Sequence, residues 1–259
     1  MKTERLIGIH PVESALDGFP GQVRRLLVAA ETKNARALAL GERAAGLDVR
    51  VERRPRSELD RLSDGQRHQD VVAEFEPANL HGEKELDRLL DAIAGMPLVL
   101  VLDGVQDPHN LGACLRTADA AGVHLVIAPK DRSVGLTPVA CKVASGAAES
   151  VPFIQVTNLA RTMKMLAEEY RVWIVGMAGE ADVNLQDIQL DGHLAIVMGS
   201  EEKGMRRLTR DNCDALVKLP MLGSVESLNV SVATGVVLYE VVRQKNRNLQ
   251  VALQGDMSA

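Results

Sequence analysis

The sequence is poor in aromatic and sulfhydryl side chains: its 259 residues include three Phe, two Tyr, one Trp and three Cys. So few aromatic rings disfavour a protein that binds single-stranded nucleic acid by base stacking. Cys114, Cys141 and Cys213 are odd in number, lie far apart and form no CxxC pair. The sequence therefore predicts neither a disulfide framework nor a metal site, and it indicates a reducing compartment.

Long apolar runs and targeting signals are also missing. No run approaches the roughly 20 residues of a membrane span, and residues 1–16 are interrupted by charges and a proline, unlike a signal peptide. The net charge of −5 disfavours a protein that coats nucleic acid by bulk charge, although a local basic face is compatible with it. We expect a cytoplasmic α/β protein without membrane contact.

Residues 1–76 have the pattern of a small α/β unit. Short strands are predicted at 25–30, 48–51 and 71–75, and helices at 12–16, 34–45 and 57–62. Residues 77–95 are predicted to be a linker containing Pro and Gly, followed by an amphipathic helix at 83–94.

Residues 96–248 show a different pattern. Pro97–Asp103 is a continuous apolar run that ends in an acid, which is typical of a buried parallel strand. Further strands are predicted at 125–128, 171–177, 194–198 and 215–219, and helices at 111–121, 139–145, 159–169 and 228–244. This alternation predicts a parallel sheet with helices on both faces. Residues 249–259 are expected to form a frayed tail.

The usual nucleotide-binding fingerprints are absent from this second part. No GxGxxG sequence follows a predicted strand. Gly199–Gly204 has the glycine spacing of a phosphate loop, but Met205 and Arg206 stand where a P-loop has Lys and Ser or Thr. A P-loop nucleotidase is therefore disfavoured.

Three other segments carry polar residues at places that favour a site. The first, Leu102–Ala118, runs from a strand end into a helix that holds Asn110 and Arg116. Residues of these types also serve as a helix cap and as a solvent-reaching arginine, so the segment alone leaves both interpretations open.

The second segment, Ile196–Met205, opens from a buried strand into a charged loop bounded by glycines. Carboxylates at the carboxyl end of a strand suit a ligand site, and a solvated turn is the alternative. In the third segment, Leu219–Gly235, polar Ser227 and Asn229 begin an otherwise apolar helix, where capping is the alternative role.

Together, the three segments resemble the SpoU (TrmH-type) branch of the SPOUT RNA 2′-O-ribose methyltransferases. The family motifs appear in order as Asn110…Arg116, as Gly199-Ser-Glu201…Gly204 and as Pro220-Met-x-Gly-Ser-Val-Glu-Ser-Leu-Asn-Val-Ser-Val-Ala233. The N-terminal part resembles the substrate-binding domain of the family's rRNA enzymes through Gly8–Glu13 and His68–Gln69. One departure is Asp70, which stands where the family usually has Gly.

The resemblance implies a fold and an activity. The C-terminal domain would contain a deep trefoil knot, a rare exception to the unknotted rule. It would bind S-adenosylmethionine, and the protein would be a homodimer whose active sites are completed across the subunit interface. The implied reaction is 2′-O-methylation of a guanosine in large-subunit (23S) rRNA.

The resemblance also implies two sets of site residues. Backbone groups that would hold the adenosine of the cofactor belong to Met198, Gly199, Leu219, Met221 and Leu228. The catalytic set would be Arg116, Asn110, Glu201, Ser227 and Asn229.

Arg116 resembles the residue proposed in the family as the base. Because a guanidinium stays protonated, we assign it a different role: binding a phosphate, orienting the hydroxyl and stabilising the forming alkoxide. Asn110 would orient the ribose or Arg116, and Glu201 would fix Arg116 or a loop amide. Ser227 and Asn229 would hold the loop or the substrate.

Two other functions compete with this hypothesis. A tRNA ribose 2′-O-methyltransferase is disfavoured by the N-terminal part, which resembles the rRNA type. A non-catalytic RNA-binding ribosome-assembly factor is disfavoured because the catalytic residues are intact. For RNA contacts, the candidates are the cluster Arg50, Arg53, Arg54 and Arg56, and the group Arg206, Arg207 and Arg210.

Overall fold

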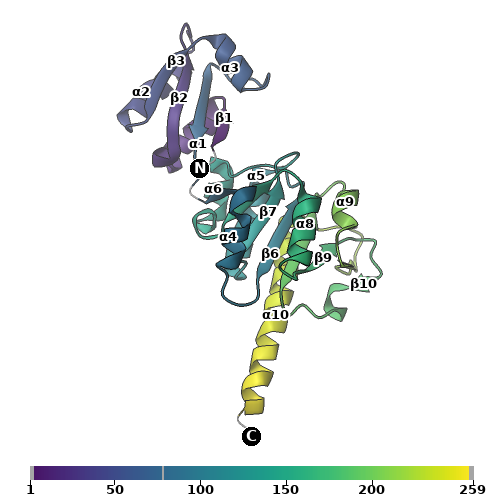
Figure 1. Ribbon diagram of the computed structural model, residues 1–259. Coiled ribbons are helices and arrows are strands. Elements are labelled where there is room, and N and C mark those ends of the chain that lie inside the picture. The colour runs from purple at the N-terminus through teal and green to yellow at the C-terminus, as the bar shows by residue number, and fades with distance from the viewer. Residues whose placement is uncertain (1–2, 78, 257–259) are drawn as a thin grey trace.

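Two β-sheets organise the chain, one in a small N-terminal unit and one in a larger C-terminal unit (Figure 1). The computed structural model describes residues 3–77 and 79–256. Its N-terminal sheet is formed by β1 (Glu4–Ile7), β2 (Val23–Ala29), β3 (Arg50–Arg54) and β4 (Val71–Phe75) in the order β1-β4-β2-β3. Its helices are α1 (Ile9–Gly18), the short η1 (Pro20–Gln22), α2 (Ala35–Gly46) and α3 (Arg56–Leu62).

The N-terminal unit follows the predicted pattern closely. The three predicted strands and the three predicted helices are confirmed, with ends that shift by a few residues. The side chain of Asn34 accepts a hydrogen bond from the Arg36 amide and so begins α2 as an N-cap. Strand β1, which pairs antiparallel with β4, was not predicted.

The C-terminal sheet has eight strands in the order β10-β12-β9-β11-β6-β7-β8-β5, and its strand pairs are parallel. The strands are β5 (Leu80–Gly82), β6 (Leu98–Asp103), β7 (Leu125–Pro129), β8 (Phe153–Val156), β9 (Trp173–Met177), β10 (Val183–Asn184), β11 (Leu194–Gly199) and β12 (Ala215–Lys218). The predicted parallel sheet is therefore confirmed.

Helices cover both faces of this sheet, as predicted. They are η2 (Glu83–Glu85), α4 (Leu86–Asp91), α5 (Pro108–Ala120), α6 (Pro138–Ala144), α7 (Ala147–Ser150), α8 (Leu159–Glu168), η3 (Leu185–Asp187), α9 (Arg207–Arg210) and α10 (Val230–Asp256). Successive side chains of β6 point to opposite faces of the sheet, and each set packs against different helices. Leu98, Leu100 and Leu102 lie in one apolar cluster with α5 and α10, whereas Val99 and Val101 lie in a second cluster with α4 and α8.

Several boundaries differ from the predictions. The short strands β8, β5 and β10 were missed, and β5 lies inside the segment 77–95 that was expected to be linker and helix. The last helix begins at Val230 and continues to Asp256, so the expectation of a frayed tail is wrong for residues 249–256. That stretch has no proline and is rich in good helix formers. Residues 257–259 of the expected tail lie outside the described residues.

The order of the strands creates a switch point next to β6. From β6 the chain adds β7 and β8 on one side and then returns to build β9 and β11 on the other. β6 and β11 are paired in register, so that Asp103 lies opposite Gly199 at their carboxyl ends. In open α/β sheets this is where ligands bind. The strand order does not test the threading of the chain, and the trefoil knot stays a prediction.

A histidine closes the opposite end of β6. The Leu98 amide donates a hydrogen bond to Nδ1 of His124 at 3.0 Å, which requires the imidazole to be unprotonated at that nitrogen. Desolvation, with the nearby charge of Lys245, lowers the pKa of His124. The hydrogen bond therefore stabilises the fold at neutral pH, where the imidazole is unprotonated, and is lost when the ring takes up a proton.

Candidate active site

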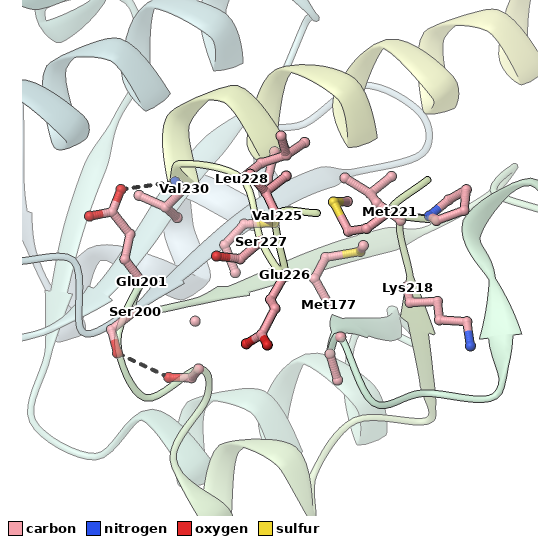
Figure 2. Close-up of a pocket in the computed structure, with 18 of the residues that line it drawn as sticks. Met177, Ser200, Glu201, Lys218, Met221, Val225, Glu226, Ser227, Leu228 and Val230 are labelled. Atoms are coloured by element: carbon pink, nitrogen blue, oxygen red, sulfur yellow. Dashed lines mark hydrogen bonds between the residues drawn. The ribbon is translucent and has the colours of Figure 1, made fainter. Parts of the chain in front are cut away.

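A cleft of about 740 Å³ lies at the carboxyl ends of β9, β11 and β12 (Figure 2). Its lining comes from residues 177–179, 198–201, 218–221 and 223–228, with Gly204, Val230 and Ala233. The last of these four segments is the loop between β12 and α10. The cleft thus occupies the edge of the sheet beside the switch point.

The residues predicted to hold a cofactor meet in this cleft. Met198, Gly199, Leu219, Met221 and Leu228 all line it. Gly199 is packed so tightly that a Cβ would stand 2.3 Å from the backbone of Gly204 and Met205. Because only glycine fits there, the loop after β11 folds directly against its own strand end.

The loop after β11 is held closed by its own hydrogen bonds. The amides of Ser200 and Gly204 each donate to the carbonyl of the other, at 3.0 and 2.9 Å. The Ser200 hydroxyl also donates to the Gly204 carbonyl at 3.2 Å (Figure 2). This tight turn sets the direction of the intervening residue, Glu201.

Glu201 joins three segments that lie far apart in the sequence. Its Oε1 accepts hydrogen bonds from Asn110 Nδ2 at 3.1 Å, from the Val230 amide at 3.1 Å and from Asn229 Nδ2. Asn229 Nδ2 also donates to Asn110 Oδ1 at 3.0 Å. Three of the predicted catalytic residues thus form one network at the start of α10, where the helix dipole favours a carboxylate.

A buried ion pair anchors the same loop to β6. Asp103 has a fully buried side chain that accepts hydrogen bonds from the Arg206 amide at 2.8 Å and from Arg206 Nε at 2.6 Å. The acid that ends the predicted strand is therefore a structural group. Arg206 was expected to contact RNA. Its guanidinium instead binds Asp103, although part of the side chain stays exposed.

Ser227 lines the cleft, as predicted for a residue near the substrate or the loop. Arg116 does not join the network. It is exposed on α5, and its Nη1 donates to Ser145 Oγ at 3.5 Å. Within the described part of this chain, no hydrogen bond joins Arg116 to Asn110 or Glu201, which bind each other, Asn229 and the Val230 amide. The roles expected of Asn110 and Glu201 stay predictions.

Sequence reasoning missed several lining residues. Met177 ends β9, Gly179 lies just after it, Lys218 ends β12, and the Glu226 carboxylate points into the cleft in Figure 2. The residues at the strand ends could have been predicted from their positions in the sequence, because the carboxyl ends of parallel strands lie at one edge of the sheet.

Behind the network lies a buried thiol. Burial raises the pKa of Cys114 to about 11, and Sγ lies 3.6 Å from the Thr234 hydroxyl. At neutral pH this thiol stays protonated and acts as an apolar group of the core.

The expected arginine cluster of the small unit is partly neutralised. Glu52 forms ion pairs with Arg50 at 2.7 Å and with Arg54 at 2.5 Å. Arg56 pairs with Asp70 at 3.3 Å. As a source of net positive charge, the cluster is therefore weaker than its sequence indicates.

Two family profiles match the chain. The profile of the SpoU rRNA methylase family matches residues 97–239, and a profile described as RNA 2′-O ribose methyltransferase substrate binding matches residues 5–81. The chain belongs to the SpoU rRNA methylase family. The first match covers strands β6 to β12 of the sheet, the cleft and the first ten residues of α10.

Relatives and solved structures agree with membership of the SpoU family. The 23S rRNA (guanosine-2′-O-)-methyltransferase RlmB of Pseudomonas aeruginosa is 53% identical over 93% of this chain and 97% of its own length. The enzyme of the same name from Escherichia coli K12 is 51% identical over 94% and 100%. A crystal structure of the SpoU methyltransferase AviRb from Streptomyces viridochromogenes in complex with AdoMet matches 95% of this chain and 91% of its own, with a TM-score of 0.61 and 25% identity.

The described helices include none that is long and apolar enough to cross a membrane.

Proposed function

We propose that the chain transfers the methyl group of S-adenosylmethionine to the 2′-hydroxyl of a guanosine in 23S rRNA. The observation that carries the proposal is the combination of family membership with about 51–53% identity to RlmB enzymes over nearly the whole chain. The cleft adds that the side chains expected to act in the reaction lie beside the expected cofactor site.

The cleft fits S-adenosylmethionine. Most of its lining residues are apolar or glycine, and the close packing at Gly199 leaves no room for a side chain on that strand end. An adenine slot of this kind selects its ligand through backbone hydrogen bonds. When bound, S-adenosylmethionine supplies a methyl group that its sulfonium charge already activates. The proposed reaction requires no metal ion.

The polar network defines the side of the cleft that faces the ribose. Asn110, Glu201 and Asn229 fix one another, so that their outer edges are preorganised before RNA arrives. The acceptor hydroxyl must lose its proton as the new C–O bond forms. Arg116 binds the neighbouring phosphate and stabilises the developing alkoxide, while the proton passes to phosphate or water.

A second copy of the chain brings Arg116 to the network. Val232, Val236 and Tyr239 of α10 are 53%, 48% and 54% exposed and lie on one side of the helix. A Cβ on Gly235 would lie 3.8 Å from Thr117, the neighbour of Arg116, so α10 packs against the helix that carries this exposed arginine. In the proposed homodimer these apolar sides of α10 pack against each other, and each Arg116 acts in the partner's site. The proposed enzyme works in the cytoplasm on its rRNA.

The test is transfer of labelled methyl from S-adenosylmethionine to unmodified 23S rRNA, with tRNA in parallel and mapping of the label. Label at one guanosine ribose of 23S rRNA is the expected result. Label in tRNA alone would overturn the substrate, and cofactor binding without label on either RNA would overturn the activity.

A further inference from the structure

Three hollows form a connected path from the small unit to the active site. The first, of about 620 Å³, lies at the ends of β2 and β3, and the second, of about 360 Å³, shares Asn34, Arg56 and Asp70 with it. The third, of about 850 Å³, shares Gln66 with the second. It lies between the two units, because it is lined by residues of β1 and by the segment before α6.

The path ends at the catalytic network. The third hollow is lined by Gln106 and Pro108 at the beginning of α5, the helix that carries Asn110. A Cβ placed on Gly104 would lie 3.8 Å from the Arg132 carbonyl and 3.7 Å from Ser200 Cβ. Arg132 lines the third hollow and Ser200 lines the cofactor cleft, so Gly104 lies between a residue of one and a residue of the other.

Cations line this path along its length. They are Lys33, Arg56, Arg67, Arg5 and Arg132, in order from the small unit towards the cleft. Lys33, Arg67 and Arg132 are exposed and form no ion pair within residues 3–77 and 79–256. The acidic lining residues are Glu31, Asp60 and Asp70, of which Asp60 binds His68 and Asp70 binds Arg56.

Two features of the third hollow are suited to an anion. Arg132 has a left-handed backbone with φ of 59°, an uncommon conformation outside glycine, and its exposed side chain lines the hollow. The buried Ser133 hydroxyl has no hydrogen-bond partner among the described residues and lies on the same wall. The exposed Arg132 guanidinium is a donor that matches the oxygens of a phosphodiester.

We propose that this path holds the RNA strand next to the methylated nucleotide, with Arg67 and Arg132 each binding a backbone phosphate. The proposal rests on the proposed function for the identity of the ligand and extends it, because it places RNA in the groove between the two units. The small unit then sets how far the strand must run before a ribose reaches Asn110. The target nucleotide is then selected by its distance along the strand from the small unit as well as by its base.

The experiment measures the affinity of the full-length protein for a 23S rRNA transcript over a salt series, with S-adenosylhomocysteine present to prevent turnover. The variants are Arg67→Gln and Arg132→Gln. The matched control is Arg171→Gln, because Arg171 is also exposed and also has a positive φ, of 52°, but lines none of the three hollows. Equal S-adenosylhomocysteine affinity in all variants shows that the folded cleft is retained.

Each path variant should reduce the slope of log affinity against log salt by about 0.7, the value of one single-strand phosphate contact. The RNA affinity should fall by about three- to fivefold at moderate salt, and the control should match the unmodified protein. Path variants with the slope of the control would overturn the path, even if the unmodified protein methylates 23S rRNA. A protein that methylates no RNA but shows the expected slopes would keep the path and overturn the proposed function.

Discussion

Substitution of Glu201 by Gln tests whether the carboxylate at the start of α10 organises the active site. The change keeps the shape of the side chain and removes its charge. One oxygen of Glu201 accepts three N–H donors. A hydrogen bond to a charged acceptor contributes about 1.5–3 kcal/mol and one to a neutral acceptor about 0.5–1.5 kcal/mol, a difference of about 1 kcal/mol per donor.

Three donors give about 3 kcal/mol, and halving this figure for the solvent exposure of Glu201 leaves about 1.5 kcal/mol. Because about 1.4 kcal/mol corresponds to a factor of ten, the single-turnover methyl-transfer rate should fall about tenfold. The thermal midpoint should fall by about 4 °C. The affinity for S-adenosylmethionine should change much less, because the network lies beside the cofactor slot.

The assay compares Glu201→Gln with Glu202→Gln in single-turnover methyl transfer, cofactor titration and thermal unfolding. Glu202 is the exposed neighbour and accepts no hydrogen bond from the described part of the chain. Its substitution should leave all three measurements unchanged. Identical rates and midpoints for the two variants would refute the argument that the shared oxygen holds the network together.

Three further predictions concern the loop, the sheet and the dimer. Gly199→Ala should abolish S-adenosylmethionine binding in a cofactor titration, because its Cβ would collide with backbone at 2.3 Å, whereas Gly18→Ala, with no atom within 4 Å and a place outside the cleft, should bind normally. His124→Gln should flatten the loss of stability on acidification: the lowered pKa of His124 means that its stabilising contribution is present above pH 6.5 and is lost as the pH falls through the folded-state pKa. Denaturant melts at pH 7.5 and 5.5 measure this effect, and a His109→Gln protein with the same flattening would count against it. Arg116→Ala should slow transfer by at least about 100-fold with unchanged cofactor affinity. Mixing it with Gly199→Ala chains should restore activity if Arg116 acts across the dimer, and no restoration would place it in its own chain's site.

The sequence predicts the sheet well where its strands are long and fully apolar. Pro97–Asp103 has only one arrangement that satisfies its backbone and buries its side chains, a central parallel strand. The strand at 153–156 is shorter, and the strand at 80–82 consists of Leu, His and Gly. Neither segment shows the pattern of apolar residues that indicates a strand. Each forms a strand because its backbone hydrogen-bonds to a neighbouring strand of the sheet.

Most of the residues predicted for the site lie close together in the structure, but their contacts could not be predicted from the sequence. The resemblance brought Asn110, Glu201 and Asn229 together as a set, while the sharing of one carboxylate oxygen depends on the turn at Gly199 and on where α10 begins. The pairing of Asp103 with Arg206 spans 103 residues and has no local signature. Arg116, the other motif residue of α5, lies apart from this network and is exposed, and the motif itself gave no indication of that separation.

The cleft is built almost entirely from the last third of the chain, since its lining begins at residue 177 and ends at 233. During synthesis the small unit and the first half of the sheet leave the ribosome before the cofactor site can exist. A chain interrupted before α10 would retain the hollows of the small unit but lack the segment that closes the cleft and supplies Asn229 and the Val230 amide. Completeness of translation is thus a condition for a functional site, and truncated products cannot compete for the methyl donor.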